Sequence, residues 1–220
     1  MLTAEPDIKQ YRRLTTPRAA SIAGVLFGLL FSASLVLLRS AIPQTLTDDI
    51  AWTDQGNQRI KFALVLMPFA GIAFLWFIGV VRDLLGDFED RFFSTVFLGS
   101  GLLFLGMVFV AMAIGGGILA VAQVEGADFP REEIIYFARA LMFQVSNVYA
   151  LRMAGVFMIS LGTIWLRTGL LPRWLALVTY LLALVLLVVI NLNLWITLVF
   201  PIWVLLISVF KLISDSRRQS

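Results

Sequence analysis

The sequence contains no cysteine and no histidine in its 220 residues. Without cysteine the protein has no disulfide bond, no thiolate nucleophile and no cysteine-ligated zinc. Without histidine it has no histidine-ligated haem and no catalytic base that depends on imidazole. Charged residues are also few, at 14% of the chain, whereas soluble domains contain about 25%. Hydrophobic residues reach 60%, and the two figures together indicate a polytopic membrane protein.

Long uncharged stretches divide the chain into candidate membrane spans, because about 20 apolar residues cross a hydrocarbon core of roughly 30 Å. The stretch 174–210 is long enough for two spans, and a span before Arg167 is complete only if Arg152 lies inside a helix. The sequence therefore predicts an all-α transmembrane bundle of six helices. The expected spans are 19–42, 61–81, 92–114, 145–167, 174–190 and 194–213. They form a single domain, 19–213, between a basic segment at 1–18 and a tail at 214–220.

The distribution of basic residues predicts the orientation of this bundle, since cytoplasmic loops carry an excess of lysine and arginine. Eleven basic residues fall on one side, namely Lys9, Arg12, Arg13, Arg18, Arg82, Arg91, Arg167, Arg173, Lys211, Arg217 and Arg218. Six fall on the other side, namely Arg39, Arg59, Lys61, Arg131, Arg139 and Arg152. We therefore expect both termini in the cytoplasm, and the segments 44–60 and 118–143 outside.

Glycine, proline and tryptophan mark the expected helix ends. The glycines at 115–117 predict the end of the third span, and Gly169 predicts a glycine cap on the fourth. Pro68 and Pro201 fall inside expected spans, where each should kink its helix and free a carbonyl group. Four tryptophans lie near span ends, as in an interfacial aromatic belt, and Trp203 does not. The four are Trp76, Trp165, Trp174 and Trp195.

The residues at about 130–144 have the pattern of an amphipathic helix in the second outer segment. Pro130 stands at its start and acidic residues fill the first turn. Its apolar stripe consists of Ile134, Phe137, Ala138, Leu141, Met142 and Val145. We expect this helix either to lie on the outer leaflet or to cap the bundle.

Arg152 is the most unusual residue of the expected spans, because a charge in the outer half of the hydrocarbon is unfavourable. One interpretation places its guanidinium in a polar outer vestibule with Gln144 and Asn147, where it would attract anions or repel cations. A second lets the side chain snorkel to the outer interface. A third is a structural ion pair. The carboxylates considered for that pair are Asp48, Asp49 and Glu125.

Small residues form a ridge along the first span, at Ala20, Gly24, Gly28 and Ser32, each four positions apart. This spacing lets a second helix approach closely. That helix belongs either to another copy of the chain or to the same chain, and both alternatives stay open here.

The first cytoplasmic loop, 82–91, contains four acidic residues between flanking arginines. Carboxylates so close together are capable of binding a divalent cation, although the spacing fits no EF-hand. The alternative is that the arginines pair with the acids and pin the two helix ends. We predict no metal site and no cofactor. Asp87 is the residue to test first if magnesium or calcium binding is found.

Two stretches resemble known proteins. Residues 165–175, with the order Trp-Leu-Arg-Thr-Gly-Leu-Leu-Pro-Arg-Trp-Leu, are similar to a turn in uncharacterised six-span bacterial integral membrane proteins of unknown function. Residues 90–101, Asp-Arg-Phe-Phe-Ser-Thr-Val-Phe-Leu-Gly-Ser-Gly, resemble such proteins as well. Together they cover about a tenth of the chain. The resemblance implies a bacterial inner-membrane protein and no particular activity.

Three functional hypotheses fit these features. The first is a non-catalytic subunit or scaffold, whose partners are the lipid bilayer and either further copies of the chain or a larger membrane complex. The second is a passive channel or facilitator with a vestibule near Arg152. The third is a lipid-acting enzyme that uses Asp87, Glu89 and Asp90. No acid or lysine occupies the centre of a span, so proton coupling is not expected and catalysis has little support. Nothing indicates nucleic acid as a partner.

Overall fold

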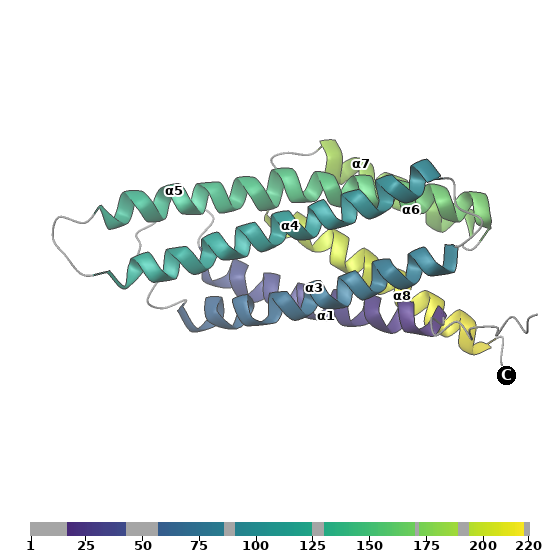
Figure 1. Cartoon of the computed structure of the whole chain (residues 1–220), viewed down its shortest axis with the longest axis horizontal. Coiled ribbons are helices and arrows are strands. Elements are labelled where there is room, and N and C mark those ends of the chain that lie inside the picture. The colour runs from purple at the N-terminus through teal and green to yellow at the C-terminus, as the bar shows by residue number, and fades with distance from the viewer. Residues whose placement is uncertain are drawn as a thin grey trace, which may run out of the picture.

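A computed structural model describes residues 17–42, 57–85, 91–124, 130–169, 172–188 and 194–217. Within these ranges the regular structure is entirely helical (Figure 1). The α-helices are α1 (Pro17–Ala41), α3 (Asn57–Leu85), α4 (Arg91–Ala122), α5 (Arg131–Gln144), α6 (Leu151–Thr168), α7 (Arg173–Val188) and α8 (Val199–Arg217). A π-helical segment, η2 (Val145–Ala150), joins α5 to α6, and a 3₁₀ segment, η3 (Leu194–Leu198), precedes α8.

Among the described residues, five helices are long and apolar enough to cross a membrane. They are α1, α3, α4, the continuous helix formed by α5, η2 and α6, and α8. The prediction of an all-α bundle is therefore confirmed, and its long apolar helices have the length and composition expected of a multi-pass membrane protein. The remaining apolar helix, α7, has 16 residues and is shorter than a typical span. The first turn of α1 and the last turns of α8 lie at the same end of the bundle (Figure 1).

The helix expected at 130–144 forms as α5, but its packing face differs from the expected stripe. Ile134, Phe137 and Leu141 are exposed, whereas Ile135 and Met142 are buried. The reason is the uninterrupted helical connection to α6, which holds α5 in line with α6 and lays it along α4 (Figure 1). The rotation of the long helix thus decides which face of α5 meets the protein. Ile134, Phe137 and Leu141 of the expected stripe are therefore exposed, whereas Ala138, Met142 and Val145 pack against the core, and both placements of this helix stay predictions.

The three glycines at 115–117 do not end the third long helix, as the sequence analysis expected. α4 continues through them to Ala122. Glycine weakens a helix by about 1 kcal/mol relative to alanine, and tertiary packing overrides so small a preference. The packing here is with α5 and α3, since a Cβ built at Gly115 would lie 3.5 Å from the sulfur of Met142 and 3.9 Å from Leu64.

The prolines and the glycine cap occupy positions that the helices tolerate. Pro68 lies inside α3, and the hydroxyl of Ser34 on α1 donates to the carbonyl of Ala63, five residues before the proline, at 2.7 Å. A neighbouring helix therefore satisfies a carbonyl near the interruption. Pro201 lies in the first turn of α8, where a missing N–H costs little. Gly169 ends α6 with φ 67°, so the predicted glycine cap is confirmed.

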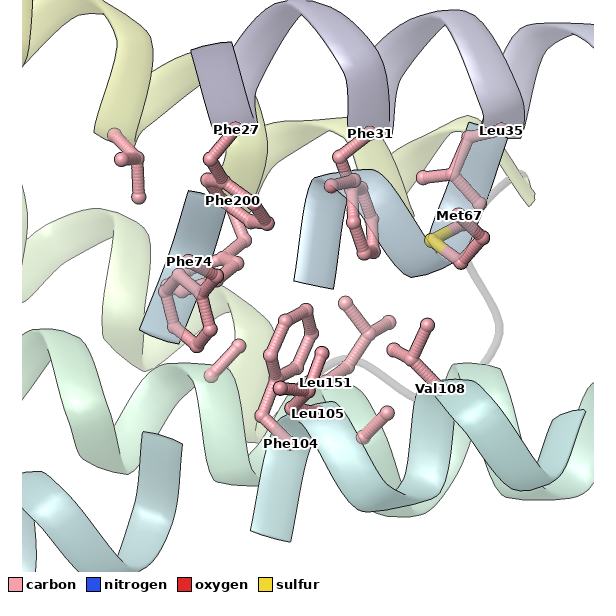
Figure 2. Close-up of a cluster of buried hydrophobic side chains, with 14 of the residues drawn as sticks. Phe27, Phe31, Leu35, Met67, Phe74, Phe104, Leu105, Val108, Leu151 and Phe200 are labelled. Atoms are coloured by element: carbon pink, nitrogen blue, oxygen red, sulfur yellow. The ribbon is translucent and has the colours of Figure 1, made fainter. Parts of the chain in front are cut away.

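Phenylalanine rings fill the centre of the bundle (Figure 2). Phe74 of α3 is the hub of this cluster. Its ring centroid lies 4.5 Å from that of Phe27, 5.6 Å from Phe104, 5.5 Å from Phe157 and 5.7 Å from Phe200. These rings come from α1, α3, α4, α6 and α8, so one aromatic cluster joins all five long helices. Such pairs contribute about 0.5–1.5 kcal/mol each beyond the area that they bury.

Candidate functional site

A buried polar pair joins the end of α1 to the π-helical segment η2. The Nη2 atom of Arg39 donates a hydrogen bond to the Oδ1 atom of Asn147 at 2.6 Å. Arg39 is only 7% exposed, although it lies two residues from the end of α1. The bond connects positions that are 108 residues apart in the sequence, so the fold alone brings them together.

The aromatic ring of Phe143 lies against the same guanidinium. The Cζ atom of Arg39 is 5.1 Å from the centroid of that ring, which is a cation–π distance. Phe143 and Asn147 are one turn apart on the long helix, and the π-helical turn starts between them at Val145. π-Helical turns occur often at functional sites. We therefore take Arg39, Phe143 and Asn147 as the candidate functional site and call them the Arg39 cluster.

Two donor nitrogens of the Arg39 guanidinium make no hydrogen bond to any described residue. Its Nε and Nη1 atoms are buried and have no hydrogen-bond partner among the residues that the structure describes. A buried donor without a partner costs about 1–3 kcal/mol, and more when it carries charge. Within the described part of the chain, two donor nitrogens at the end of α1 therefore lack hydrogen-bond acceptors.

A second buried arginine lies on the same face of the long helix. Arg139 precedes Phe143 by one turn, so Arg139, Phe143 and Asn147 follow each other at intervals of four. The side chain of Arg139 is fully buried, and its Cζ atom is 5.5 Å from the ring centroid of Tyr136. The buried face of α5 therefore holds a cation between apolar Ile135 and Met142, whereas the outer face carries Phe137 and Leu141.

Arg152, the residue that the sequence analysis singled out, is half-buried and bonds to its own helix. Its Nη1 atom donates to the carbonyl oxygen of Val148 at 2.9 Å. This contact directs the guanidinium back along the helix toward α5. Asn147 accepts its hydrogen bond from Arg39, and Gln144 is exposed. The described contacts thus divide the three residues of the predicted vestibule, and whether Arg152 snorkels stays a prediction.

The small-residue ridge of α1 faces α8 of the same chain. A Cβ atom at Gly24 would collide with the hydroxyl of Ser208. One at Gly28 would lie 2.7 Å from the Cβ of Leu205 and 3.0 Å from the carbonyl oxygen of Pro201. The other two members, Ala20 and Ser32, are buried and half-buried. The close approach of two helices at Gly24 and Gly28 is therefore an internal one.

The acidic loop lies largely outside the described residues. This applies to Asp87, Glu89 and Asp90, and likewise to Asp48, Asp49 and Glu125, which were considered as partners of Arg152. Among the residues that the structure does describe, no group of three acidic side chains is placed to hold a metal ion. The lipid-enzyme hypothesis and the ion-pair alternative therefore stay predictions.

Comparison with protein-family models, with curated proteins and with solved structures found no match. Sequence reasoning missed Arg39 as a site residue, because a basic residue at a span end is usually an interfacial charge. One signal was available, since Arg39 is the first charged residue after Arg18 and follows a fully uncharged stretch.

Proposed function

We propose that this chain is a non-catalytic subunit or scaffold of a bacterial inner-membrane assembly, with six spans and both termini in the cytoplasm. The sixth span is α7, which runs back alongside α6 before α8 returns in the opposite direction (Figure 1). At 1.5 Å per residue its 16 residues reach about 24 Å, so α7 needs flanking residues or a locally thin bilayer to cross. The exposed apolar residues of α5, Ile134, Phe137 and Leu141, face lipid near the outer interface.

The observation that carries this proposal is the closed aromatic core around Phe74. A channel needs polar groups along a continuous path, and an intramembrane enzyme needs a nucleophile with a base. The centre of the described bundle instead holds packed rings. Buried hydroxyls such as those of Ser100 and Ser160 bond to carbonyl groups of their own helices at 2.6 Å and 2.9 Å. A structural role in an assembly requires neither a polar path nor a catalytic group, so it is the function that this packed core supports best.

The surface offered to a second copy is the outer face of α4. A Cβ built at Gly99 or Gly106 meets no atom within 4 Å, and Ala113 and Ala120 are exposed on the same face. These small residues recur every seven positions, which is two helical turns, and would let a second helix approach closely. An apolar groove of about 310 Å³ lies beside them, lined by Leu64, Met67, Pro68, Phe109, Met112 and Ala113.

The test compares two leucine substitutions at open glycines. Gly106→Leu adds bulk to the α4 face, and Gly79→Leu adds the same bulk to α3, where a Cβ also meets nothing within 4 Å. We expect light scattering in a mild detergent to show a smaller species for Gly106→Leu and the wild-type species for Gly79→Leu. A wild-type protein that is monomeric and co-purifies with no other membrane protein would contradict the scaffold proposal.

A passive facilitator is the second candidate, because the Arg39–Asn147 pair and Arg152 place polar side chains on or beside the same segment, η2. Its test is ion or solute flux into liposomes that contain the purified protein. Flux that depends on Arg152 would favour the facilitator over the scaffold, whereas liposomes as tight as protein-free ones would count against it.

A further inference from the structure

The position of Arg39 along α1 indicates which part of a lipid bilayer would surround its side chain. Arg18 and Arg39 lie near opposite ends of α1, and 21 residues at 1.5 Å separate them by about 31 Å. A hydrocarbon core is roughly 30 Å thick. If α1 crosses the bilayer, Arg39 therefore lies at the level where the hydrocarbon ends and the phosphate groups of phospholipids begin.

The donors of Arg39 are only partly used at this depth. Nη2 donates to Asn147, and the ring of Phe143 covers the guanidinium at 5.1 Å. Nε and Nη1 are buried without an acceptor, and among the described residues no carboxylate bonds to Arg39. An amide oxygen and an aromatic ring do not neutralise a positive charge. A buried charge is tolerated when it is paired and its hydrogen bonds are made.

We propose that the Arg39 cluster binds the phosphate oxyanion of a ligand at the membrane surface. A guanidinium is planar and presents several N–H donors, which suits the oxygens of a phosphate group better than a single point charge would. Asn147 fixes one nitrogen of the guanidinium by a hydrogen bond, and the ring of Phe143 covers one side of it. The Nε and Nη1 atoms of Arg39 are buried, so binding of a phosphate group requires side chains at the end of α1 to move apart.

The same phosphate chemistry is available from an anionic phospholipid headgroup or from free phosphate. Thermal unfolding of the full chain in phosphate-free detergent distinguishes them. The additions are phosphatidylglycerol, diacylglycerol with the same acyl chains but no phosphate, and inorganic phosphate against chloride at equal ionic strength. We expect phosphatidylglycerol in large excess over its Kd to raise the Tm by about 5 °C and diacylglycerol to leave it unchanged. An equal rise with inorganic phosphate would assign the site to soluble phosphate.

The matched variants are Arg39→Gln and Arg59→Gln. Arg59 is exposed at the start of α3 and carries the same charge. The rise in Tm should disappear in Arg39→Gln and persist in Arg59→Gln. If wild type shows no rise with either phosphate compound, or if Arg39→Gln responds as wild type does, the proposal is wrong.

A third variant, Asn147→Asp, tests the proposal even if Arg39→Gln does not fold. Asn147→Asp places a carboxylate where the amide now accepts the 2.6 Å hydrogen bond from Arg39. The internal carboxylate should raise the Tm in the absence of any added anion and remove most of the response to phosphatidylglycerol. An Asn147→Asp protein that is no more stable than wild type and keeps the full lipid response would overturn the proposal, because Arg39 would then have no unmet demand for an anion.

Discussion

The indole nitrogen of Trp203 donates a hydrogen bond to the Oγ1 atom of Thr179 at 2.9 Å. Trp203 is 3% exposed, and its ring lies 5.8 Å from that of Trp165. The bond ties α8 to the shortest apolar helix, α7. It also explains why Trp203 lies away from the expected interfacial belt. This tryptophan is a core residue whose single polar atom has a partner within the bundle.

The first prediction concerns that bond. Trp203→Phe removes the donor, and Thr179→Val removes the acceptor and leaves the indole N–H buried without a partner. We expect Thr179→Val to lower stability more than Trp203→Phe does, because an unsatisfied buried donor costs about 1–3 kcal/mol. A double-mutant cycle on unfolding in detergent should give a coupling of about 0.6–1.7 kcal/mol. A coupling of zero would mean that the two helices are held by packing alone.

The second prediction concerns the hub of the aromatic core. Phe74→Ala should destabilise the bundle by about 3–5 kcal/mol, since it opens a cavity among rings from five helices. Phe69→Ala on the same helix removes an exposed ring and should change the Tm little. The measurement is thermal unfolding of both variants under one set of conditions. An equal loss of stability in Phe74→Ala and Phe69→Ala would mean that Phe74 is not at the centre of the core.

The third prediction concerns the ridge of α1. Gly24→Leu and Gly28→Leu should lower yield and Tm without changing the oligomeric species, because each new side chain meets α8. Overpacking typically costs about 1–3 kcal/mol, and the nearby carbonyl of Pro201 has little freedom to move. Gly79→Leu is the control on an open face. A stable, folded monomer from Gly24→Leu would instead assign the ridge to a contact between copies.

The fourth prediction concerns Arg152. The hydrogen bond described for it is to a carbonyl of its own helix, so Arg152→Leu should leave the Tm unchanged or raise it. Loss of a partner for a buried carboxylate would instead cost about 3–5 kcal/mol and reduce expression. Arg152→Lys is the companion variant, because it keeps the charge without the planar donors. Retained stability together with altered ion flux would support the facilitator.

The fifth prediction concerns threading, and the absence of native cysteine makes its test clean. New cysteines at Thr53 and Ala127 should react with an impermeant thiol reagent in intact cells, and one at Gly86 should not. The basis is the bias of basic residues toward the side of the termini. Labelling at Gly86 alone would show that the bundle is inverted.

Helices are present where the sequence combines sufficient apolar length with end signals. The stretch 19–42 forms α1, and Gly169 ends α6 in the left-handed conformation that favours glycine. The disagreements occur where tertiary packing opposes a local preference. α4 passes through three glycines, and Trp165, expected at the interface, is buried against Trp203. A local sequence pattern does not predict which neighbouring helix a given helix face will contact.

The sequence by itself determined that this protein is a bundle of apolar helices, because the cost of unpaired backbone groups in lipid allows long uncharged segments no other structure. Only the tertiary structure decided which faces meet. Hydrophobicity does not distinguish lipid from protein when both are apolar, so the contact of Gly28 with α8 and the exposure of Phe137 on α5 depend on close packing. The same holds for Arg39 and Asn147, whose hydrogen bond joins residues 108 positions apart. Local sequence periodicity cannot predict a contact between residues so far apart in the chain. The pair forms because the fold brings the end of α1 next to the π-helical segment η2.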